Sequence, residues 1–235
     1  MAASRRSLLA GLALVAGHVP PGAARAAGRS EFLLIRHGES YVNIAPDPQL
    51  RDAGVSYPLT PVGMVQAKRM AAGLPSAPSV IWASTRLRAI QTADAVAWTW
   101  GGEVRLAPEL VEVDFGDVAR MADKVAMLAE VRRIYDGWLD GRSSAGAPDG
   151  EDFDAVKARF LPAARRIIGE AAGAPGPAVL VAHGALLAAT APSLFVNVSP
   201  AFARASPLRN CAVIRGERSA DGALRCLDWD GKTPT

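Results

Sequence analysis

The sequence predicts an α/β fold, a three-layer αβα sandwich with a mostly parallel central sheet. Short apolar runs with the character of buried strands alternate along the 235-residue chain with helical patterns, as in βαβ units. The runs are apolar at nearly every position, which is typical of parallel strands that helices cover on both faces. No linker, repeat or low-complexity tract divides residues 27–235, so we expect them to form a single domain.

Residues 1–26 have the layout of a cleavable export signal. Arg5 and Arg6 precede an apolar stretch over residues 8–17 and a small-residue site at 24–26, and no acidic residue occurs before Glu31. The paired arginines are typical of a twin-arginine signal. The alternative, a membrane anchor, would need roughly 20 apolar residues, about twice the length of this stretch. We therefore expect a periplasmic or secreted protein with no stable membrane association after signal removal.

The charge balance argues against a nucleic-acid partner. The chain has 26 basic and 23 acidic residues, and removal of residues 1–26 takes away three arginines and leaves 23 of each kind. A neutral domain offers no long-range attraction for nucleic acid or for an anionic membrane. Any positive potential must therefore be local.

Three strands and three helices can be placed along the chain. The predicted strands are residues 32–35, 80–83 and 179–182, and the predicted helices are residues 61–72, 87–100 and 153–172. Thr60 and Pro61 suit the N-cap and the first position of the first helix. Pro162 is expected to kink or restart the last helix.

Residues 117–150 are less regular and form a short insertion. A helical stretch over residues 121–139 ends in a loop at 141–150 that is rich in glycine, serine and proline. An insertion of this kind above a sheet often covers a pocket.

The cysteines and tryptophans give structural expectations. Cys211 and Cys226 could form a disulfide across a C-terminal hairpin in an oxidising compartment, and they could equally be two free buried thiols. Their spacing is not that of a metal site. Trp82, Trp98 and Trp100 are expected to pack in the core or on helix faces.

Two of the three histidines in the chain stand in matching positions. His37 and His183 each follow a predicted strand and precede a glycine, whereas His18 lies in the predicted signal. Open α/β sheets present reactive side chains at the carboxyl ends of their strands. Arg36 places a cation beside His37, and Arg88 opens the helix after the second predicted strand, where it can face the same crevice. These residues predict a phosphate site that contains a nucleophilic imidazole.

A set of motifs in a fixed order resembles a known family. They are Arg36-His37-Gly38-Glu39-Ser40 with Asn43, Leu59-Thr60-Pro61-x-Gly63 with Gln66-Ala67, Ser84 followed by Arg88-Ala89-x-Gln91-Thr92-Ala93, Leu110-x-Glu112-x-x-x-Gly116, Gly150-Glu151 and Val181-Ala182-His183-Gly184. From Phe32 to about Val213 the chain resembles the histidine phosphatase superfamily, in its phosphoglycerate mutase-like branch 1. The resemblance implies the α/β fold of that branch.

The resemblance also implies catalysis through a phosphohistidine intermediate. His37 would attack phosphorus, while Arg36, Arg88 and His183 would neutralise the phosphoryl oxygens. Two guanidinium groups beside His37 disfavour a further positive charge, which keeps the imidazole neutral. Arg86 competes with Arg88, but the spacing of the motif favours Arg88. Phosphoryl transfer depends mostly on positioning and charge neutralisation, so we expect neither a metal nor another cofactor.

Further site residues follow from the same resemblance. Glu112 matches the proton donor to the leaving oxygen, and it can act as an acid only if bound phosphate or burial favours its protonated form. Glu109 and Asp114 are close enough in the sequence to compete with it. The expected substrate-binding residues are Ser40, Asn43, Gly38, Glu39 and Gly184.

The sequence favours a phosphomonoester hydrolase acting on a small phosphorylated substrate, and no motif selects that substrate. The runner-up is a phosphoglycerate-type phosphomutase, but the residues after Gly116 depart from the mutase pattern and the insertion is short. Glu39 and Gly184 differ from the pattern of the acid phosphatase and phytase branch. The alternative from another class is a noncatalytic phosphate-binding module, which the intact set of predicted catalytic residues disfavours. The oligomeric state stays open.

The insertion and its flanks carry arginines with two possible roles. They could bind a second anionic group on the substrate, or they could be solvated surface residues, which is the more common case on an amphipathic helix. The residues in question are Arg120, Arg132, Arg133 and Arg142.

Overall fold

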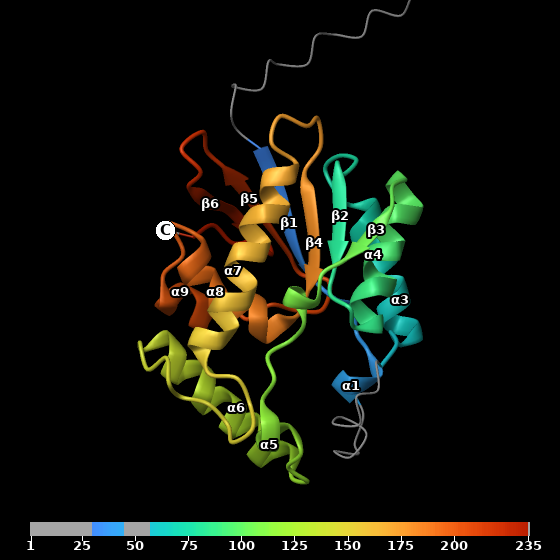
Figure 1. Ribbon diagram of the computed structural model, residues 1–235. Coiled ribbons are helices and arrows are strands. Elements are labelled where there is room, and N and C mark those ends of the chain that lie inside the picture. The colour runs from blue at the N-terminus through green and yellow to red at the C-terminus, as the bar shows by residue number, and fades with distance from the viewer. Residues whose placement is uncertain (1–29, 45–56, 235) are drawn as a thin grey trace, which may run out of the picture.

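The computed structural model describes residues 30–44 and 57–234, and its centre is one six-stranded sheet with the strand order β3-β2-β4-β1-β5-β6 (Figure 1). The strands are β1 (Ser30–Arg36), β2 (Val80–Ala83), β3 (Val104–Leu106), β4 (Ala178–Ala182), β5 (Val213–Arg218) and β6 (Leu224–Trp229). The strands β1, β4, β2 and β3 pair in parallel, whereas β5 and β6 are antiparallel to their neighbours. The predicted mostly parallel sheet is confirmed, and the three predicted strands lie next to one another in its interior.

Helices cover both faces of the sheet, which confirms the three-layer architecture (Figure 1). They are α1 (Tyr41–Ile44), α3 (Pro61–Ala72), α4 (Leu87–Trp100), the 3₁₀ turn η1 (Pro108–Leu110), α5 (Gly116–Ala119), α6 (Lys124–Leu139), α7 (Phe153–Glu170), α8 (Gly184–Leu194) and α9 (Pro200–Ala205). Successive side chains of a strand point to opposite faces. Leu33 and Ile35 therefore join the apolar core under α3 and α4, while Phe32 and Leu34 join the core under α7 and α8.

Local signals set the bounds of the helices. The hydroxyl of Thr60 accepts a backbone N–H of the first turn of α3 at 3.0 Å, and Pro61 takes the first position, as predicted. α7 runs through Pro162 as one helix, so the predicted restart does not occur. It ends at Glu170, slightly before the predicted end at residue 172.

The insertion contributes α5 and α6, which lie beyond the carboxyl ends of the parallel strands (Figure 1). α6 begins at Lys124 because the carboxylate of Asp123 caps two backbone N–H groups of its first turn. Trp138 fixes α6 to the domain by stacking on Phe115 and on Phe153, with ring centroids 6.2 and 5.1 Å apart. The insertion is therefore packed against the edge of the sheet at which the predicted site lies.

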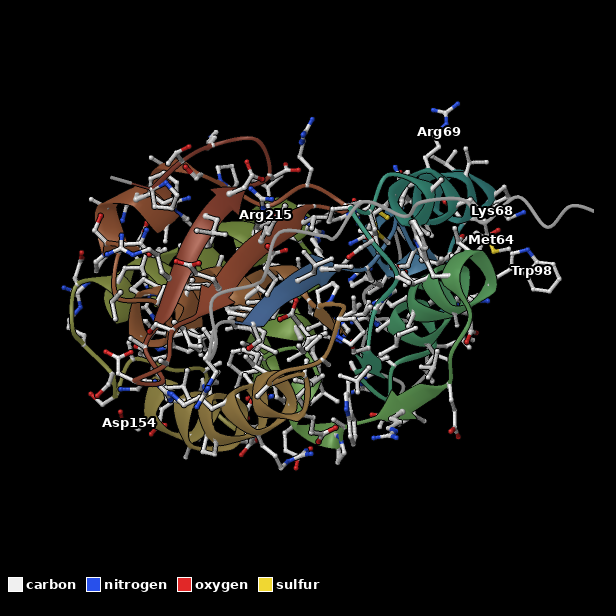
Figure 2. The ribbon with its side chains drawn as sticks, turned by 90° about the horizontal axis from the view of Figure 1, so that it is seen from above. Met64, Lys68, Arg69, Trp98, Asp154 and Arg215 are labelled. Atoms are coloured by element: carbon white, nitrogen blue, oxygen red, sulfur yellow. The ribbon has the colours of Figure 1, made fainter. Side chains whose placement is uncertain are left out.

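The tryptophan expectation is wrong for Trp98. This side chain is 91% exposed on α4 and points away from the sheet (Figure 2), and it is not on the buried face of the helix, which ends at Val96. Trp82 is half-buried, with the guanidinium groups of Arg105 and Arg166 over its ring. Trp100 packs on a helix face, where its indole N–H donates to a carbonyl of α3 at 2.8 Å.

Cys211 and Cys226 are free thiols in the structure, Cys226 buried and Cys211 half-buried. Burial raises the pKa of each thiol to about 12, and both are therefore protonated at neutral pH.

The predicted export signal, residues 1–26, lies outside the described residues. Within the described ranges, none of the helices combines the length and the hydropathy needed to cross a membrane.

Candidate active site

The sheet brings the two histidines together. β1 and β4 pair in a register that aligns Arg36 with Ala182, and His37 and His183 are the residues that follow. The backbone N–H of His37 donates to the carbonyl of Ala182 at 3.0 Å. The two imidazole centroids lie 5.1 Å apart, with 63° between the ring planes. Residues far apart in the sequence thus form one buried site at the carboxyl edge of the sheet.

Hydrogen bonds define the protonation state of His37. Its Nδ1 lies 2.7 Å from the carbonyl oxygen of Gly38, which can only accept, so Nδ1 carries the proton. Nε of Arg88 donates to Nε2 of His37 at 3.1 Å, so Nε2 keeps its lone pair. Burial and then the charge of Arg88 lower the pKa of His37 from 6.5 to about 3. The imidazole is therefore neutral at physiological pH, with its nucleophilic nitrogen at Nε2.

His183 is oriented by a third strand of the sheet. Its Nε2 lies 2.8 Å from Oγ of Ser84, the residue that follows β2. Burial and then the charge of Arg88 lower the pKa of His183 well below 6.5, so this imidazole is neutral as well. Its Nδ1 is buried and has no hydrogen-bond partner within the described residues. When the Ser84 hydroxyl donates to Nε2, the proton resides on Nδ1, which can then donate to an anionic oxygen.

Arg36 and Arg88 add two largely buried positive charges. An Nη atom of Arg36 donates to the carbonyl of Leu208 at 2.7 Å, whereas its Nε is buried with no partner in the part of the chain that the structure describes. A Cβ added at Gly184 would lie 3.0 Å from that Nε, so the absence of a side chain there lets the guanidinium lie close against the start of α8. Burial lowers the pKa of Arg88 to about 10, and it stays charged at neutral pH. Arg86 is exposed at the rim.

Glu112 reaches the same edge from the segment after η1. Its carboxylate accepts the backbone N–H groups of Leu186 at 2.8 Å and of Ala185 at 3.3 Å, and so caps the N-terminus of α8. The segment that carries it is fixed by Arg159, whose guanidinium donates to three of its carbonyls and forms an ion pair with Glu151 at 2.6 Å. This frame holds the Glu112 carboxylate near the charges of the site.

Ser40 and Asn43 mainly stabilise the loop that follows β1. Ser40 is fully buried, and its hydroxyl and backbone N–H both donate to Oδ1 of Asn43, at 3.1 and 3.0 Å. The side-chain amide of Asn210 donates to the carbonyl of His37 at 3.2 Å and to Oδ1 of Asn43 at 3.4 Å. These contacts hold the backbone of the nucleophile in position.

Gly38 and Glu39 also make structural contacts. The backbone N–H of Gly38 donates to Oγ1 of Thr92 at 3.1 Å, and the carboxylate of Glu39 accepts from the hydroxyl of Thr60 at 2.7 Å. The Gly38 N–H therefore already has a partner on α4. A Cβ at Gly38 would lie 2.8 Å from the carbonyl of Gly63, so the glycine is needed for close packing of the loop against α3.

Three supporting residues carried no predicted role. Ser84 and Thr92 belong to motifs that the sequence displays, and Asn210 lies near their end, but only the fold shows which atoms they contact. The sequence pointed to these residues only by their place in or near the motifs. A hydroxyl or an amide can form hydrogen bonds with many partners, so its residue type does not predict which atom it contacts.

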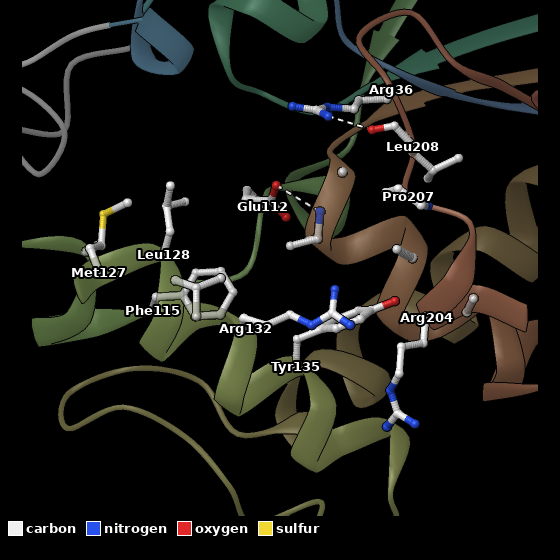
Figure 3. Close-up of a pocket in the computed structure, with 16 residues that line it drawn as sticks. Arg36, Glu112, Phe115, Met127, Leu128, Arg132, Tyr135, Arg204, Pro207 and Leu208 are labelled. Carbon is white, nitrogen blue, oxygen red and sulfur yellow. Dashed lines mark hydrogen bonds between the residues drawn. The ribbon is translucent and has the colours of Figure 1, made fainter. Parts of the chain in front are cut away.

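A pocket of about 460 Å³ opens onto this site between the insertion and the segments after β4 (Figure 3). Arg36, Glu112 and Gly184 line its inner end. Of the three candidate acids, Glu112 is the one that lines this pocket among the described residues, whereas Asp114 is exposed and caps the backbone N–H of Gly116. The geometry therefore favours Glu112 over its neighbours in the sequence.

The site combines a neutral nucleophile, buried cations and a carboxylate at a helix N-terminus. Such a set can bind a phosphoryl group, form a bond to phosphorus and exchange a proton with the leaving oxygen. Among residues 30–44 and 57–234, no three histidine, cysteine or acidic side chains are grouped so that they could hold a metal ion.

Comparisons with solved structures agree with this architecture. A mycobacterial glucosyl-3-phosphoglycerate phosphatase, solved with VO3, superposes with a TM-score of 0.71 at 22% identity, over 86% of this chain and 100% of that one. A phosphoserine phosphatase from Entamoeba histolytica, solved with 3-phosphoglyceric acid, gives a TM-score of 0.66 at 21% identity, over 85% and 96% of the two chains. An alpha-ribazole phosphatase from Shigella flexneri gives 0.65 at 21% identity, over 85% and 96%. At these identities the likeness shows the fold.

The family is shown by the sequence. No curated protein matches the chain. The family model described as "Histidine phosphatase superfamily (branch 1)" matches residues 32–230, which include every residue of the site described above. The chain therefore belongs to branch 1 of the histidine phosphatase superfamily.

Proposed function

We propose that this histidine phosphatase hydrolyses a small phosphomonoester through a phosphohistidine intermediate on His37. The observation that carries the proposal is the pair of hydrogen bonds that places a proton on Nδ1 and a lone pair on Nε2 of His37. Burial, then the charge of Arg88 and to a smaller extent that of Arg36 lower the pKa of the imidazole. These two charges attract a phosphoryl dianion to the nitrogen that is able to attack it.

In the first step, Nε2 of His37 attacks phosphorus while the bond from phosphorus to the ester oxygen breaks. Arg88 moves its N–H from Nε2 to a phosphoryl oxygen, and Arg36 and His183 donate to the others through Nε and Nδ1, the two buried atoms without a partner among the described residues. Glu112, in its protonated form, gives its proton to the leaving oxygen. The products are an alcohol, a phosphorylated His37 and an ionised Glu112.

In the second step, a water molecule attacks phosphorus opposite Nε2. Glu112 takes a proton from this water, the bond between phosphorus and nitrogen breaks, and inorganic phosphate leaves. His37 regains its lone pair and Glu112 its proton, so the cycle closes. The backbone N–H groups at the start of α8 stabilise the ionised carboxylate between the two steps.

Hydrolysis is favoured over a mutase reaction by the pairing of the insertion arginines. A mutase must hold a second phosphate, which needs free cations near the leaving group. Arg120, Arg133 and Arg142 instead form ion pairs with acidic side chains close to them in the sequence, at 2.8, 2.6 and 3.3 Å.

The proposal is tested with p-nitrophenyl phosphate and a metal chelator. We expect turnover that survives the chelator and is lost in His37→Ala. A protein that binds phosphate tightly but releases no product would be a binding module instead. Transfer of the phosphoryl group to an added phosphoglycerate in preference to water would identify a mutase.

We also propose that residues 1–26 direct export to the periplasm, on the strength of their charge and hydropathy pattern. The test is a fusion of these residues to a reporter that is active only after export. Export should fail when Arg5→Lys and Arg6→Lys are combined. Unchanged export of that variant would contradict the twin-arginine route.

A further inference from the structure

We propose that the alcohol half of the substrate is apolar, so that the enzyme acts on phosphomonoesters of aliphatic or aromatic alcohols. This inference rests on the proposed function, because it assigns the pocket beside His37 to the leaving group. The pocket is continuous with the phosphate site, since Arg36, Glu112 and Gly184 form its inner end. A phosphoryl group held at His37 would therefore direct its ester oxygen toward Glu112 and its alcohol into the pocket (Figure 3).

The wall of the pocket is largely apolar. Phe115, just before α5, and Met127, Leu128 and Val131 of α6 line it. Leu208 lies across the pocket from Leu128 (Figure 3). Leu128 is 53% exposed, whereas Phe115, Met127 and Val131 are half-buried and pack on the core. A largely apolar wall beside a charged site is typical of a ligand-binding pocket.

The charges at the outer end of the pocket are already paired. Nε of Arg132 lies 2.7 Å from one carboxylate oxygen of Asp136, and Nε of Arg204 lies 2.9 Å from the other. Arg204 also pairs with Asp140. The side chains of these pairs are between 31 and 54% exposed, so each carboxylate offsets the charge of its arginine and a second anionic group on the substrate would compete with it.

Tyr135 is a half-buried polar side chain in the same wall. Its phenol is uncharged at neutral pH, and burial raises its pKa further, to about 12. Its ring lies under the guanidinium of Arg132, with the carbon of that group 5.8 Å from the ring centroid. Between the phosphate site and the paired arginines, the lining residues are mostly apolar, a chemistry that suits hydrocarbon better than a ring of sugar hydroxyls.

The test uses methyl, propyl and pentyl phosphate, whose leaving alcohols are chemically alike. We expect kcat/KM to rise about fourfold for each methylene buried, and by at least about tenfold from methyl to pentyl phosphate. Glycerol 1-phosphate and 3-phosphoglycerate should be hydrolysed no faster than propyl phosphate. A flat series, or a preference for either polar ester over pentyl phosphate, would overturn the inference.

A pair of substitutions on α6 locates the effect. Leu128→Asn should lower the ratio of kcat/KM for pentyl over methyl phosphate about tenfold, because it makes the wall polar. Val125→Asn is the matched control: Val125 lies on the same helix, is 78% exposed and does not line the pocket, so the ratio should stay unchanged. Equal ratios in the two variants would overturn the assignment of the pocket.

The outcomes separate this inference from the proposed function. Absence of turnover on every ester, p-nitrophenyl phosphate included, would refute hydrolysis and with it the inference. Turnover of p-nitrophenyl phosphate with no gain along the alkyl series would leave hydrolysis standing and refute the apolar leaving group alone.

Discussion

Arg88 donates from Nε to Nε2 of His37 at 3.1 Å, across the contact between α4 and the end of β1. The bond requires a lone pair on the nitrogen that receives it, so the same contact that places a cation at the site also keeps the nucleophile unprotonated. Thr92, one turn along α4, accepts the N–H of Gly38 and donates to the carbonyl of Arg88 at 2.7 Å. One helix therefore supplies both the cation and the support for the loop.

The first prediction concerns Arg88→Gln. Loss of the guanidinium removes one cause of the low pKa of His37, so that pKa should rise from about 3, while burial still holds it below 6.5. We expect kcat/KM to fall about a hundredfold or more, as for other preorganised donors. The pKa is measured by NMR of the imidazole nitrogens, which three histidines make readily assignable.

Arg86→Gln is the matched control for that experiment. Arg86 is exposed two positions before Arg88 and is not among the causes of the His37 shift. An equal rise in the His37 pKa in both variants would show that the shift does not depend on the contact with Arg88.

The second prediction is that acid lowers the free energy of unfolding, in part through His37. Its pKa is about 3 in the folded protein and 6.5 in the reference state, so between these values the unfolded chain binds the extra proton. The free energy of unfolding should therefore decrease as pH falls below 6.5, by up to about 1.4 kcal/mol per pH unit for this histidine. At neutral pH the effect is absent, because both states are unprotonated.

The measurement is urea unfolding of the wild type and of His37→Gln at several pH values between about 5 and about 7. Other groups titrate in both proteins, so the quantity of interest is the difference between their slopes. Identical slopes would mean that His37 is protonated in the folded state as readily as in the unfolded chain.

The third prediction concerns the proton donor. Glu112→Gln keeps an oxygen that can accept the N–H groups of α8, so the fold should be retained. Alkyl phosphates, whose alcohols need a proton, should lose far more activity than p-nitrophenyl phosphate, whose phenolate leaves unaided. Glu109→Gln is the control, and a selective loss on alkyl esters there would move the acid from Glu112 to Glu109.

The fourth prediction concerns Gly184→Ala. The new methyl group would lie 3.0 Å from Nε of Arg36 and would displace the guanidinium from the start of α8. We expect inorganic phosphate to inhibit about tenfold less strongly, since one charged donor is lost. Gly169→Ala on α7 is the control, because an added Cβ there meets nothing within 4 Å. Inorganic phosphate should inhibit this variant as strongly as it inhibits the wild type. Unchanged inhibition in Gly184→Ala would show that Arg36 does not contact the phosphoryl group.

The sequence predicted the interior of the sheet well because the three strands predicted there are apolar throughout. All five residues of β4 are buried, and a short segment of this kind is readily predicted as a strand. The sequence did not predict the bounds of β3, which has only three residues, or those of β5 and β6, which alternate between buried and more exposed positions. Pairing across the sheet decides whether such short segments become strands. Local pattern cannot supply that information.

The same limit applies to the site. The imidazoles and guanidinium groups were predictable from their residue types, because few other roles explain them at strand ends. The supporting contacts of Ser84 and Asn210 were not, since they join segments that only the fold brings together. Trp98 shows the converse: a large apolar residue on a helix was expected to pack, yet it is 91% exposed at the edge of a pocket between α3 and α4.

The central claim is that His37 becomes phosphorylated at Nε2, and rapid acid-free quenching during turnover tests it most directly. With a phosphoryl-labelled substrate, we expect label on the peptide that contains His37, assigned to the Nε2 isomer by NMR, and no label in His37→Ala. Turnover without any labelled protein, or label on a different residue of the wild type, would contradict the account.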